Sequence, residues 1–141
     1  MDNTTKEAGM CFGCSPRNPI GLKLRFAMDG EVCRSTFTAG PEHQGWTGYV
    51  HGGIISTMLD EVMAQWLWLQ DIPAMTAEMT TRFSKAVPVN VPLALESRCT
   101  GGKGKLYTLE GRIILPDGSV PCRATAKFLR LPGNTTYVKE I

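Results

Sequence analysis

Alternating apolar and polar residues mark the beginning of the folded part of the chain. In the stretch LKLRFAM, residues 22–28, every second residue is large and apolar. This two-residue period predicts a half-buried β-strand. Asp29-Gly30 then supplies the signal of a hairpin turn, and residues 31–38 are expected to form the returning strand.

From Gly53 onward the period becomes helical. Apolar residues recur in adjacent pairs every four residues, which is the pattern of a helix with a broad apolar face. The pairs are Ile54-Ile55, Met58-Leu59, Val62-Met63 and Trp66-Leu67. Pro73 prevents this helix from continuing much past Gln70.

Four extended segments follow the helix, separated by the turn signals VPVNVP, GGKG and PDG. They are residues 74–84, 93–100, 105–115 and 120–131. One apolar helix between two strands and four strands predicts an α+β fold, in which a curved antiparallel sheet wraps around the helix. Little else covers the sheet edges, so we expect the chain to associate with copies of itself.

A chain of 141 residues is long enough for one domain with its own core. We expect a polar tail with a CxxC motif at residues 1–18, one folded domain at 19–133 and a short tail at 134–141. The apolar stretch around the helix is interrupted by Asp60, Glu61 and Gln65, so it predicts a buried helix and not a membrane span.

The charges and the start of the chain indicate which partners and which cellular location to expect. A net charge of +2 with scattered basic residues does not predict a nucleic-acid binder, although a small anionic ligand would suit it. The polar start MDNTTKEAGM has no apolar core, so we expect no secretory signal and a cytoplasmic protein.

Five cysteines are expected to be reduced thiols in such a protein. Cys11 and Cys14 form one CxxC, but no second pair completes a four-ligand zinc site. The motif is therefore expected to be structural and the protein to need no metal or cofactor, with a redox or zinc role as the alternative that metal analysis would test.

Asp60 stands in the middle of the apolar helix, where an ionised carboxylate loses hydration. One interpretation is a solvated stripe, in which Asp60 and Glu61 would share a helix face with other polar or small residues. The other is a general base or nucleophile that faces a cleft. Periodicity alone leaves both open.

His51-Gly52-Gly53 precedes the helix, and the first N–H groups of a helix have no partner within it. Such groups can bind a developing oxyanion, helped by the helix dipole. His51 can equally be a helix-entry residue with a single hydrogen bond. Asp60 follows Gly52 by eight residues, or about 12 Å along a helix axis, so cooperation between them requires a second copy of the chain.

Three segments carry a resemblance to a known family. QGWTGYVHGGIISTMLDEVMA, CFGCSPRNPIGLKLRF and MTAEMTTRFSKAVPV resemble segments of the hotdog thioesterases of the phenylacetate-pathway type. The resemblance covers most of the chain. It implies a hotdog fold, an acyl-coenzyme A substrate and hydrolysis without a metal. From the uncovered sheet edges and the helix spacing we expect a homodimer or dimer of dimers with active sites shared between chains.

The resemblance also assigns roles to residues. Gly52 or Gly53 would polarise the thioester carbonyl, and His51 would shape the turn. Asp60 would be the base or nucleophile, and Thr76 would position the water or the carboxylate. Some members place a loop Asn or Gln at the position that Gly45 occupies here, so the adjacent Gln44 is the candidate for that substrate-binding role.

Substrate-binding roles are expected nearby. Arg82 and Lys85 are candidates for the coenzyme A phosphates, although basic residues at strand ends are often only solvated. Trp46, Met63 and Trp66 are candidates for the acyl pocket, although the two helix residues also fit a core. Besides hydrolysis, the sequence leaves open an acyl-thioester binding module without turnover and a hotdog dehydratase, which would need a histidine placed against a carboxylate.

Overall fold

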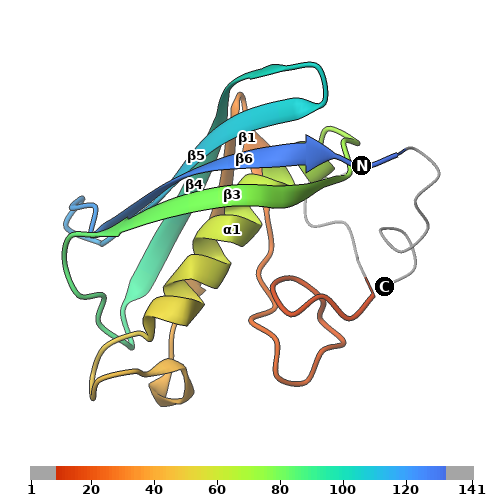
Figure 1. Ribbon diagram of the computed structural model, residues 1–141. Helices are drawn as coiled ribbons and strands as arrows, with labels where there is room; N and C mark the ends of the chain where they lie inside the picture. Colours follow the sequence, from red (N-terminus) through yellow and green to blue (C-terminus); the bar gives the residue numbers. More distant parts are fainter. Residues whose placement is uncertain (1–8, 133–141) are drawn as a thin grey trace.

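The computed structural model describes residues 9–132, which form one antiparallel sheet and one long helix (Figure 1). The strands follow the order β1-β2-β4-β5-β6-β3 across the sheet. The elements are β1 (Ala27–Asp29), β2 (Val32–Thr38), η1 (Pro41–His43), α1 (Gly52–Trp68), β3 (Ala74–Phe83), β4 (Pro92–Lys103), β5 (Leu106–Ile114) and β6 (Cys122–Arg130). The predicted α+β architecture is confirmed. The first eight residues of the expected amino-terminal tail and the expected tail at 134–141 lie outside the described residues.

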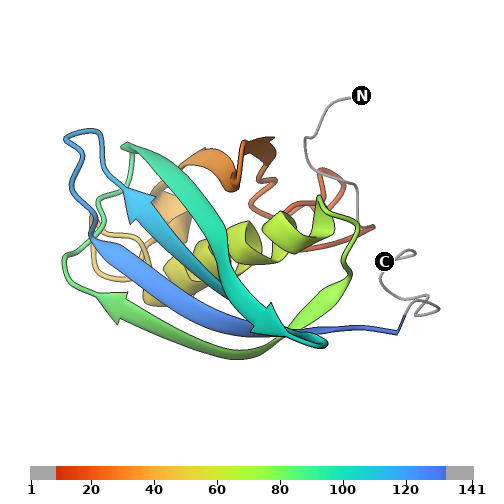
Figure 2. The same ribbon diagram turned by 90° about the horizontal axis from the view of Figure 1, so that it is seen from above.

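The sheet curves around α1, so that the helix lies in its concave face (Figure 2). Burial of the paired apolar residues holds the two layers together. The fully or almost fully buried apolar residues of α1 are Ile55, Met58, Leu59, Val62, Met63 and Leu67. Gly111 of β5 allows the close approach, because a Cβ there would lie 3.2 Å from Cγ of Met63.

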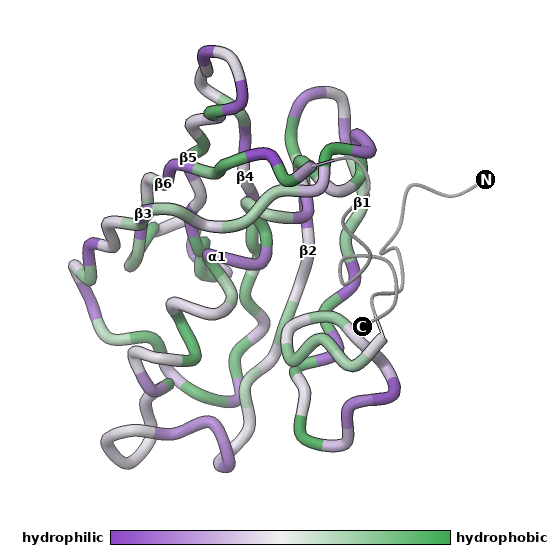
Figure 3. The backbone as a smooth tube through the Cα atoms, turned by 45° about the vertical axis from the view of Figure 1, so that its right-hand side comes forward, coloured by the Kyte–Doolittle hydropathy of each residue, from purple (hydrophilic) through white to green (hydrophobic). Residues whose placement is uncertain are grey.

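Polar and apolar residues alternate along the strands, as the backbone coloured by hydropathy illustrates (Figure 3). In β6 the inward positions are buried and the positions between them are exposed. This is the two-residue period of a sheet with one covered face. Within residues 9–132, no helix has the length and apolar character that a membrane span requires.

The first expected strand is much shorter than the alternating pattern predicts. Only Ala27–Asp29 pairs with β2, so the prediction of a strand from residue 22 was wrong for residues 22–26. The side chains of Leu22, Leu24 and Phe26 are nevertheless buried. Their backbone follows the CxxC segment instead, because the N–H groups of Leu22 and Leu24 donate to carbonyl groups of residues 12 and 13. Lys23 between them has φ = 55°, which is not a strand conformation.

The GGKG segment also differs from the prediction. Gly101 and Gly102 belong to β4, which continues to Lys103, and the turn to β5 consists of Gly104 and Lys105. Gly104 has φ = 63°, the left-handed region that glycine occupies without strain. The turn therefore lies at the end of the motif, where only two residues connect the strands.

Candidate active site

The start of α1 is capped by the side chain of His51. Its Nδ1 accepts a hydrogen bond from the backbone N–H of Gly53 at 2.8 Å. The N–H of Gly52 has no hydrogen-bond partner among the described residues. The two glycines that the resemblance left as alternatives therefore differ, and Gly52 carries the donor that remains available to a ligand.

The loop before α1 fixes the backbone of His51. The His51 N–H donates to the carbonyl of His43 at 2.8 Å. His43 in turn accepts from the Gly40 N–H at 2.9 Å and packs its ring edge-on against Phe37 of β2, with ring centroids 5.3 Å apart. Through these contacts the rigid sheet determines where the helix begins.

Gln44 holds the same loop through its side-chain amide. Its Nε2 donates to the carbonyl of Pro41 at 3.0 Å, and its Oε1 accepts from the N–H of Gly48 at 2.5 Å. Both ends of the amide are thus used inside the loop. This geometry supports a role for Gln44 in shaping the loop.

Asp60 faces the edge strand β3, where it meets Thr76. The Thr76 hydroxyl donates to Oδ1 of Asp60 at 2.5 Å. The register of β3 against β6 shifts between Thr76 and Glu78, so a β-bulge lies directly beside this pair. Bulges of this kind redirect a side chain relative to its strand. The structure thus brings together the two residues that the resemblance paired.

The surroundings of Asp60 favour its protonated form. Burial raises the pKa of the Asp60 carboxyl above its ordinary value, and the hydrogen bond from Thr76 partly opposes this shift. A raised carboxylate pKa makes a stronger base once the proton has left. Asp60 therefore has the environment that a catalytic carboxylate requires.

The solvated-stripe interpretation of the helix does not fit the structure. All residues of the supposed stripe are at least partly buried; they are Thr57, Asp60, Glu61, Ala64, Gln65 and Trp68. Gln65 is only 4% exposed. Glu61 points to a different part of the molecule from Asp60, toward Cys11 in the amino-terminal segment. Asp60 and Glu61 are thus partly buried carboxylates in two separate environments.

A groove of about 490 Å³ opens at the start of α1, beside Gly52. Aromatic side chains and one lysine line much of it. They are Trp46, Tyr49, Phe83 and Lys85. Trp46 is 87% exposed, and Tyr49 and Phe83 are about half exposed. The groove thus offers apolar surface and a cation next to the available N–H group.

The other expected binding residues occupy different places. Arg82 is exposed on β3 but is not among the residues that line the groove. Met63 is fully buried, and Trp66 donates its ring N–H to the carbonyl of Glu31 at 2.8 Å, so both belong to the core. Tyr49 and Phe83 were not predicted. In the sequence, only their nearness to the predicted site residues could have indicated them: Tyr49 lies just before the HGG turn, and Phe83 lies two residues before Lys85.

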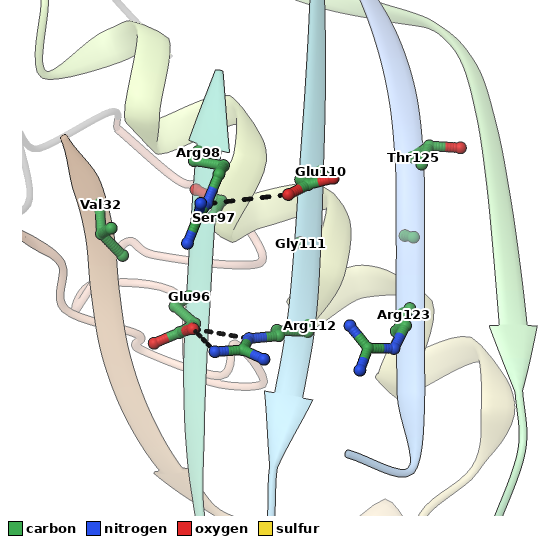
Figure 4. A pocket seen from close by; sticks show the side chains of 10 residues that line it. Val32, Glu96, Ser97, Arg98, Glu110, Gly111, Arg112, Arg123 and Thr125 are labelled. Carbon is green, nitrogen blue, oxygen red and sulfur yellow. Dashed lines mark hydrogen bonds and ion pairs between the residues drawn. The ribbon is translucent and has the colours of Figure 1, made fainter. Parts of the chain in front are cut away.

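A second hollow, of about 230 Å³, lies on the face of the sheet that points away from α1 (Figure 4). At its base Glu96 accepts hydrogen bonds from Arg112, at 2.6 Å from Nε, and from Arg34. Burial alone would raise the pKa of Glu96, but these two guanidinium groups hold it below its ordinary value. This charge network is separate from the Asp60 environment and stabilises the outer face of the sheet.

Comparison with known proteins places the chain in a family. A model of the thioesterase superfamily matches residues 47–122, which is more than half of the chain and contains α1, Asp60 and Thr76. The chain belongs to the thioesterase superfamily. It is also 28% identical over 96 residues to acyl-coenzyme A thioesterase THEM4 of Xenopus laevis. The match covers 67% of this chain, which spans only 43% of the length of that relative.

Solved structures confirm the fold of this thioesterase-superfamily chain. A crystal structure of another thioesterase superfamily protein matches with a TM-score of 0.80 and 27% identity, covering 84% of this chain and 62% of that one. The Escherichia coli protein PaaI, of the phenylacetic acid degradation operon, matches with a TM-score of 0.74 and 17% identity, covering 79% and 82%. The resemblance to PaaI-like hotdog thioesterases is thereby confirmed.

Proposed function

We propose that this protein hydrolyses acyl-coenzyme A thioesters to a free acid and coenzyme A. The observation that carries this proposal is the pair formed by Asp60 and Thr76, a partly buried carboxylate with a hydroxyl 2.5 Å away. The free N–H of Gly52 at the start of the same helix supplies the donor that a thioester carbonyl requires. Chelation of metal ions should leave the chemical step intact, because these groups need no metal.

The chemistry follows from the available groups. The Gly52 N–H polarises the carbonyl, while ionised Asp60 removes a proton from an attacking water or attacks the carbonyl carbon itself. With water as the nucleophile, a C–O bond forms, the C–S bond breaks, and the departing thiolate receives the proton that Asp60 removed from water. With Asp60 as the nucleophile, the thiolate leaves from an acyl–Asp60 anhydride, and a water molecule then cleaves this anhydride, releasing the acid, restoring Asp60 and supplying the proton that the thiolate takes up. Both routes give the acid and the free thiol. Thr76 holds the carboxylate and orients the nucleophile.

The proposed site is shared between two chains. α1 is continuous from Gly52 to Trp68, so about 12 Å of helix axis separates Gly52 from Asp60. Both groups must come within about 3 Å of one reacting centre. A two-fold axis that sets two helices antiparallel would bring the start of each beside the middle of the other. β3 has only β6 as a neighbour in this chain, so its outer edge is available for such a contact.

The groove beside Gly52 is the proposed substrate channel. Trp46, Tyr49 and Phe83 offer an apolar wall for the acyl group, and Lys85 a cation for the phosphates of coenzyme A. We place Arg82 at the rim of this channel, one residue before Phe83. The free state of all five cysteines is consistent with the proposed location in the cytoplasm.

A relative of the same fold supports this assignment. A hypothetical thioesterase of Streptococcus pneumoniae, solved with coenzyme A, matches with a TM-score of 0.71 and 17% identity, covering 77% of this chain and 87% of that one. Variant structures of that protein replace an aspartate and a threonine. Those two residues are as far apart in its sequence as Asp60 and Thr76 are here, 16 residues.

The experiment is an assay of the full chain against a panel of aryl and medium-chain acyl-coenzyme A esters, with a dye that reports free thiol. We expect Asp60→Asn to lower turnover by about two to four orders of magnitude while leaving the fold intact. Glu110→Gln, at an exposed carboxylate on β5, is the matched control and should retain activity. A chain that binds these esters tightly but turns none over would instead be a binding module.

A further inference from the structure

The CxxC motif lies against α1, on the side that Glu61 faces. The turn is closed by a hydrogen bond from the Ser15 N–H to the carbonyl of Cys11 at 3.0 Å. The sulfur atoms of Cys11 and Cys14 and a carboxylate oxygen of Glu61 all lie within 4.8 Å of one another. Three donor atoms that are far apart in the sequence therefore converge on one point.

The CxxC motif packs closely against the side-chain carboxylate of Glu61 on the helix. A Cβ at Gly13 would lie 2.5 Å from the carboxyl carbon of Glu61. Only glycine fits at this position without displacing Glu61. Sγ of Cys11 lies 3.8 Å from both carboxylate oxygens. The CxxC motif and Glu61 are thus held in register by the fold.

A fourth polar group completes the cluster. Gln65 lies one helical turn after Glu61 and is only 4% exposed. Its Nε2 lies 3.6 Å from Sγ of Cys14 and 3.3 Å from Oε2 of Glu61. Its Oε1 is buried and has no hydrogen-bond partner in the structure. Rotation of the amide by half a turn would place this oxygen where Nε2 now lies, facing the Cys14 thiol and the Glu61 carboxylate.

The cluster contains donors that bind cations but includes no cation of its own. Burial raises the pKa of Glu61 to about 7, with Cys11 adding to the shift and Gln65 opposing it. The hydrogen bond from Cys14 lowers the pKa of the Cys11 thiol to about 5. Buried groups of this kind are normally paired with a cation or coordinate a metal.

We propose that this cluster binds one Zn²⁺ ion through Sγ of Cys11, Sγ of Cys14, a carboxylate oxygen of Glu61 and, after the amide rotation, Oε1 of Gln65. Thiolates and a carboxylate oxygen are ligands that Zn²⁺ takes in four-coordinate sites, and the Gln65 oxygen would fill the fourth position. Binding displaces into solvent the proton held by Cys14, and those of Cys11 and Glu61 where these groups are protonated.

The distances already match a tetrahedral ion. Bonds of about 2.3 Å to sulfur and about 2.1 Å to oxygen would separate a sulfur from an oxygen ligand by about 3.6 Å, and two oxygens by about 3.4 Å. The structure has 3.8 Å between Cys11 and Glu61, 3.6 Å between Cys14 and the Gln65 amide, and 3.3 Å between that amide and Glu61. Only small adjustments are needed.

The site is structural and independent of the proposed hydrolysis. It would tie the amino-terminal segment to the middle of α1, and its ligands do not include Asp60 or Thr76. Closed zinc sites contribute to folding because the ion holds segments that the core alone does not fix. Failure of the hydrolysis proposal would leave this inference standing, and the reverse also holds.

The test uses the full chain, stripped of metal with a chelator under reducing conditions and titrated with Co²⁺ and then with Zn²⁺. We expect one Co²⁺ per chain with thiolate-to-metal charge-transfer absorption, which Zn²⁺ abolishes. Cys11→Ser and Cys14→Ser should each weaken Zn²⁺ binding by more than about tenfold, the loss that even outer partners of a metal can cause. Cys99→Ser, a thiol on β4 outside the cluster, should bind as the unaltered chain does.

Alkylation followed by peptide mapping keeps the inference testable if the serine variants do not fold. Zn²⁺ should protect Cys11 and Cys14 of the unaltered chain from modification, while Cys99 reacts at the same rate with and without the ion. Binding of less than one ion per chain, or protection that does not map to Cys11 and Cys14, would overturn the proposal. The proposal would also be overturned if the protein, isolated in reducing buffer, retained a Cys11–Cys14 disulfide and did not bind Zn²⁺.

Discussion

Asp60 and Glu61 are neighbours in the sequence, yet their carboxylates serve different parts of the molecule. Successive residues of a helix point about 100° apart. Asp60 therefore meets Thr76 on β3, while Glu61 meets Cys11 in the amino-terminal segment. Burial raises the pKa of both. Adjacent helix positions thus place two carboxylates in contact with different segments, one in the proposed catalytic pair and one in the proposed metal site.

Removal of the Thr76 hydroxyl should affect chemistry more than binding. We expect Thr76→Ala to lower kcat more than it raises KM, because the hydroxyl acts on the nucleophile in the transition state. The hydrogen bond from Thr76 lowers the pKa of Asp60, so its loss raises that pKa further. Asp60 works as the ionised form. The acid limb of kcat/KM should therefore move to higher pH, which a pH profile measures.

Thr80→Ala is the control for that variant, because Thr80 is an exposed threonine on the same strand. It should leave the pH profile in place. A Thr76→Ala enzyme with only a raised KM would make Thr76 a binding residue. An acid limb that stays where it is would show that Thr76 does not contact the ionised base during turnover.

The start of α1 illustrates what the sequence could and could not resolve. The HGG turn predicted a helix start with unpaired N–H groups, and the resemblance named both glycines. Which glycine keeps its N–H available depends on the orientation of the His51 ring, and a residue pattern does not encode that. In the structure the Gly53 N–H donates its hydrogen bond to the His51 ring, so of these two N–H groups only that of Gly52 remains available within the described part of the chain. A cap role for His51 was one of the two interpretations that the sequence left open.

The hydrogen bond by which His51 caps the helix leads to a prediction about stability. We expect His51→Ala to lower the free energy of unfolding by about 1 kcal/mol, because the N–H of Gly53 at the helix start loses its acceptor. His51→Asn should restore most of the stability and of the turnover that His51→Ala loses, since asparagine is a strong N-cap residue. Urea unfolding followed by circular dichroism measures the first effect, and the thiol-release assay the second. If asparagine restores the stability but not the turnover, the imidazole itself takes part in the reaction.

Among the elements, the strong periodic signals were the ones that the structure confirmed. The helix and the five longer strands follow the burial of alternate or paired apolar residues, which local sequence encodes directly. The errors occurred where long-range contacts decide. Residues 22–26 bury alternate side chains as a strand would, but their backbone bonds to the CxxC segment. The residue pattern left zinc binding by Cys11 and Cys14 only as an alternative and did not indicate Glu61 as their partner, because Cys11 and Glu61 are 50 residues apart and only the packed fold joins them.

At the scale of the whole molecule, the two halves of the proposed site do not meet within one chain. Gly52 lies at the start of α1 and Asp60 in its middle, and a continuous helix keeps them apart. β3 runs alongside α1 at the edge of the sheet and carries Thr76 (Figure 1). Pairing of two such edges would bring the helix start of one chain toward the Asp60–Thr76 pair of the other.

Mixed dimers provide the decisive measurement of this arrangement. One chain would carry Asp60→Asn, and the other Gly52→Leu, whose side chain enters the groove beside Phe83, 3.8 Å from the position of its Cβ. Each variant alone should be inactive. If the site is shared, both lesions of a mixed dimer fall in the same active site, so the second site is intact and about half of the wild-type activity per dimer returns.

Differently tagged chains, purified through both tags, give mixed dimers of known composition, and a pair of differently tagged Asp60→Asn chains is the matched control. Mixed dimers that exchange subunits, fold and remain inactive would place the whole site within one chain, and the route from Gly52 to the Asp60 of a partner would have to be abandoned.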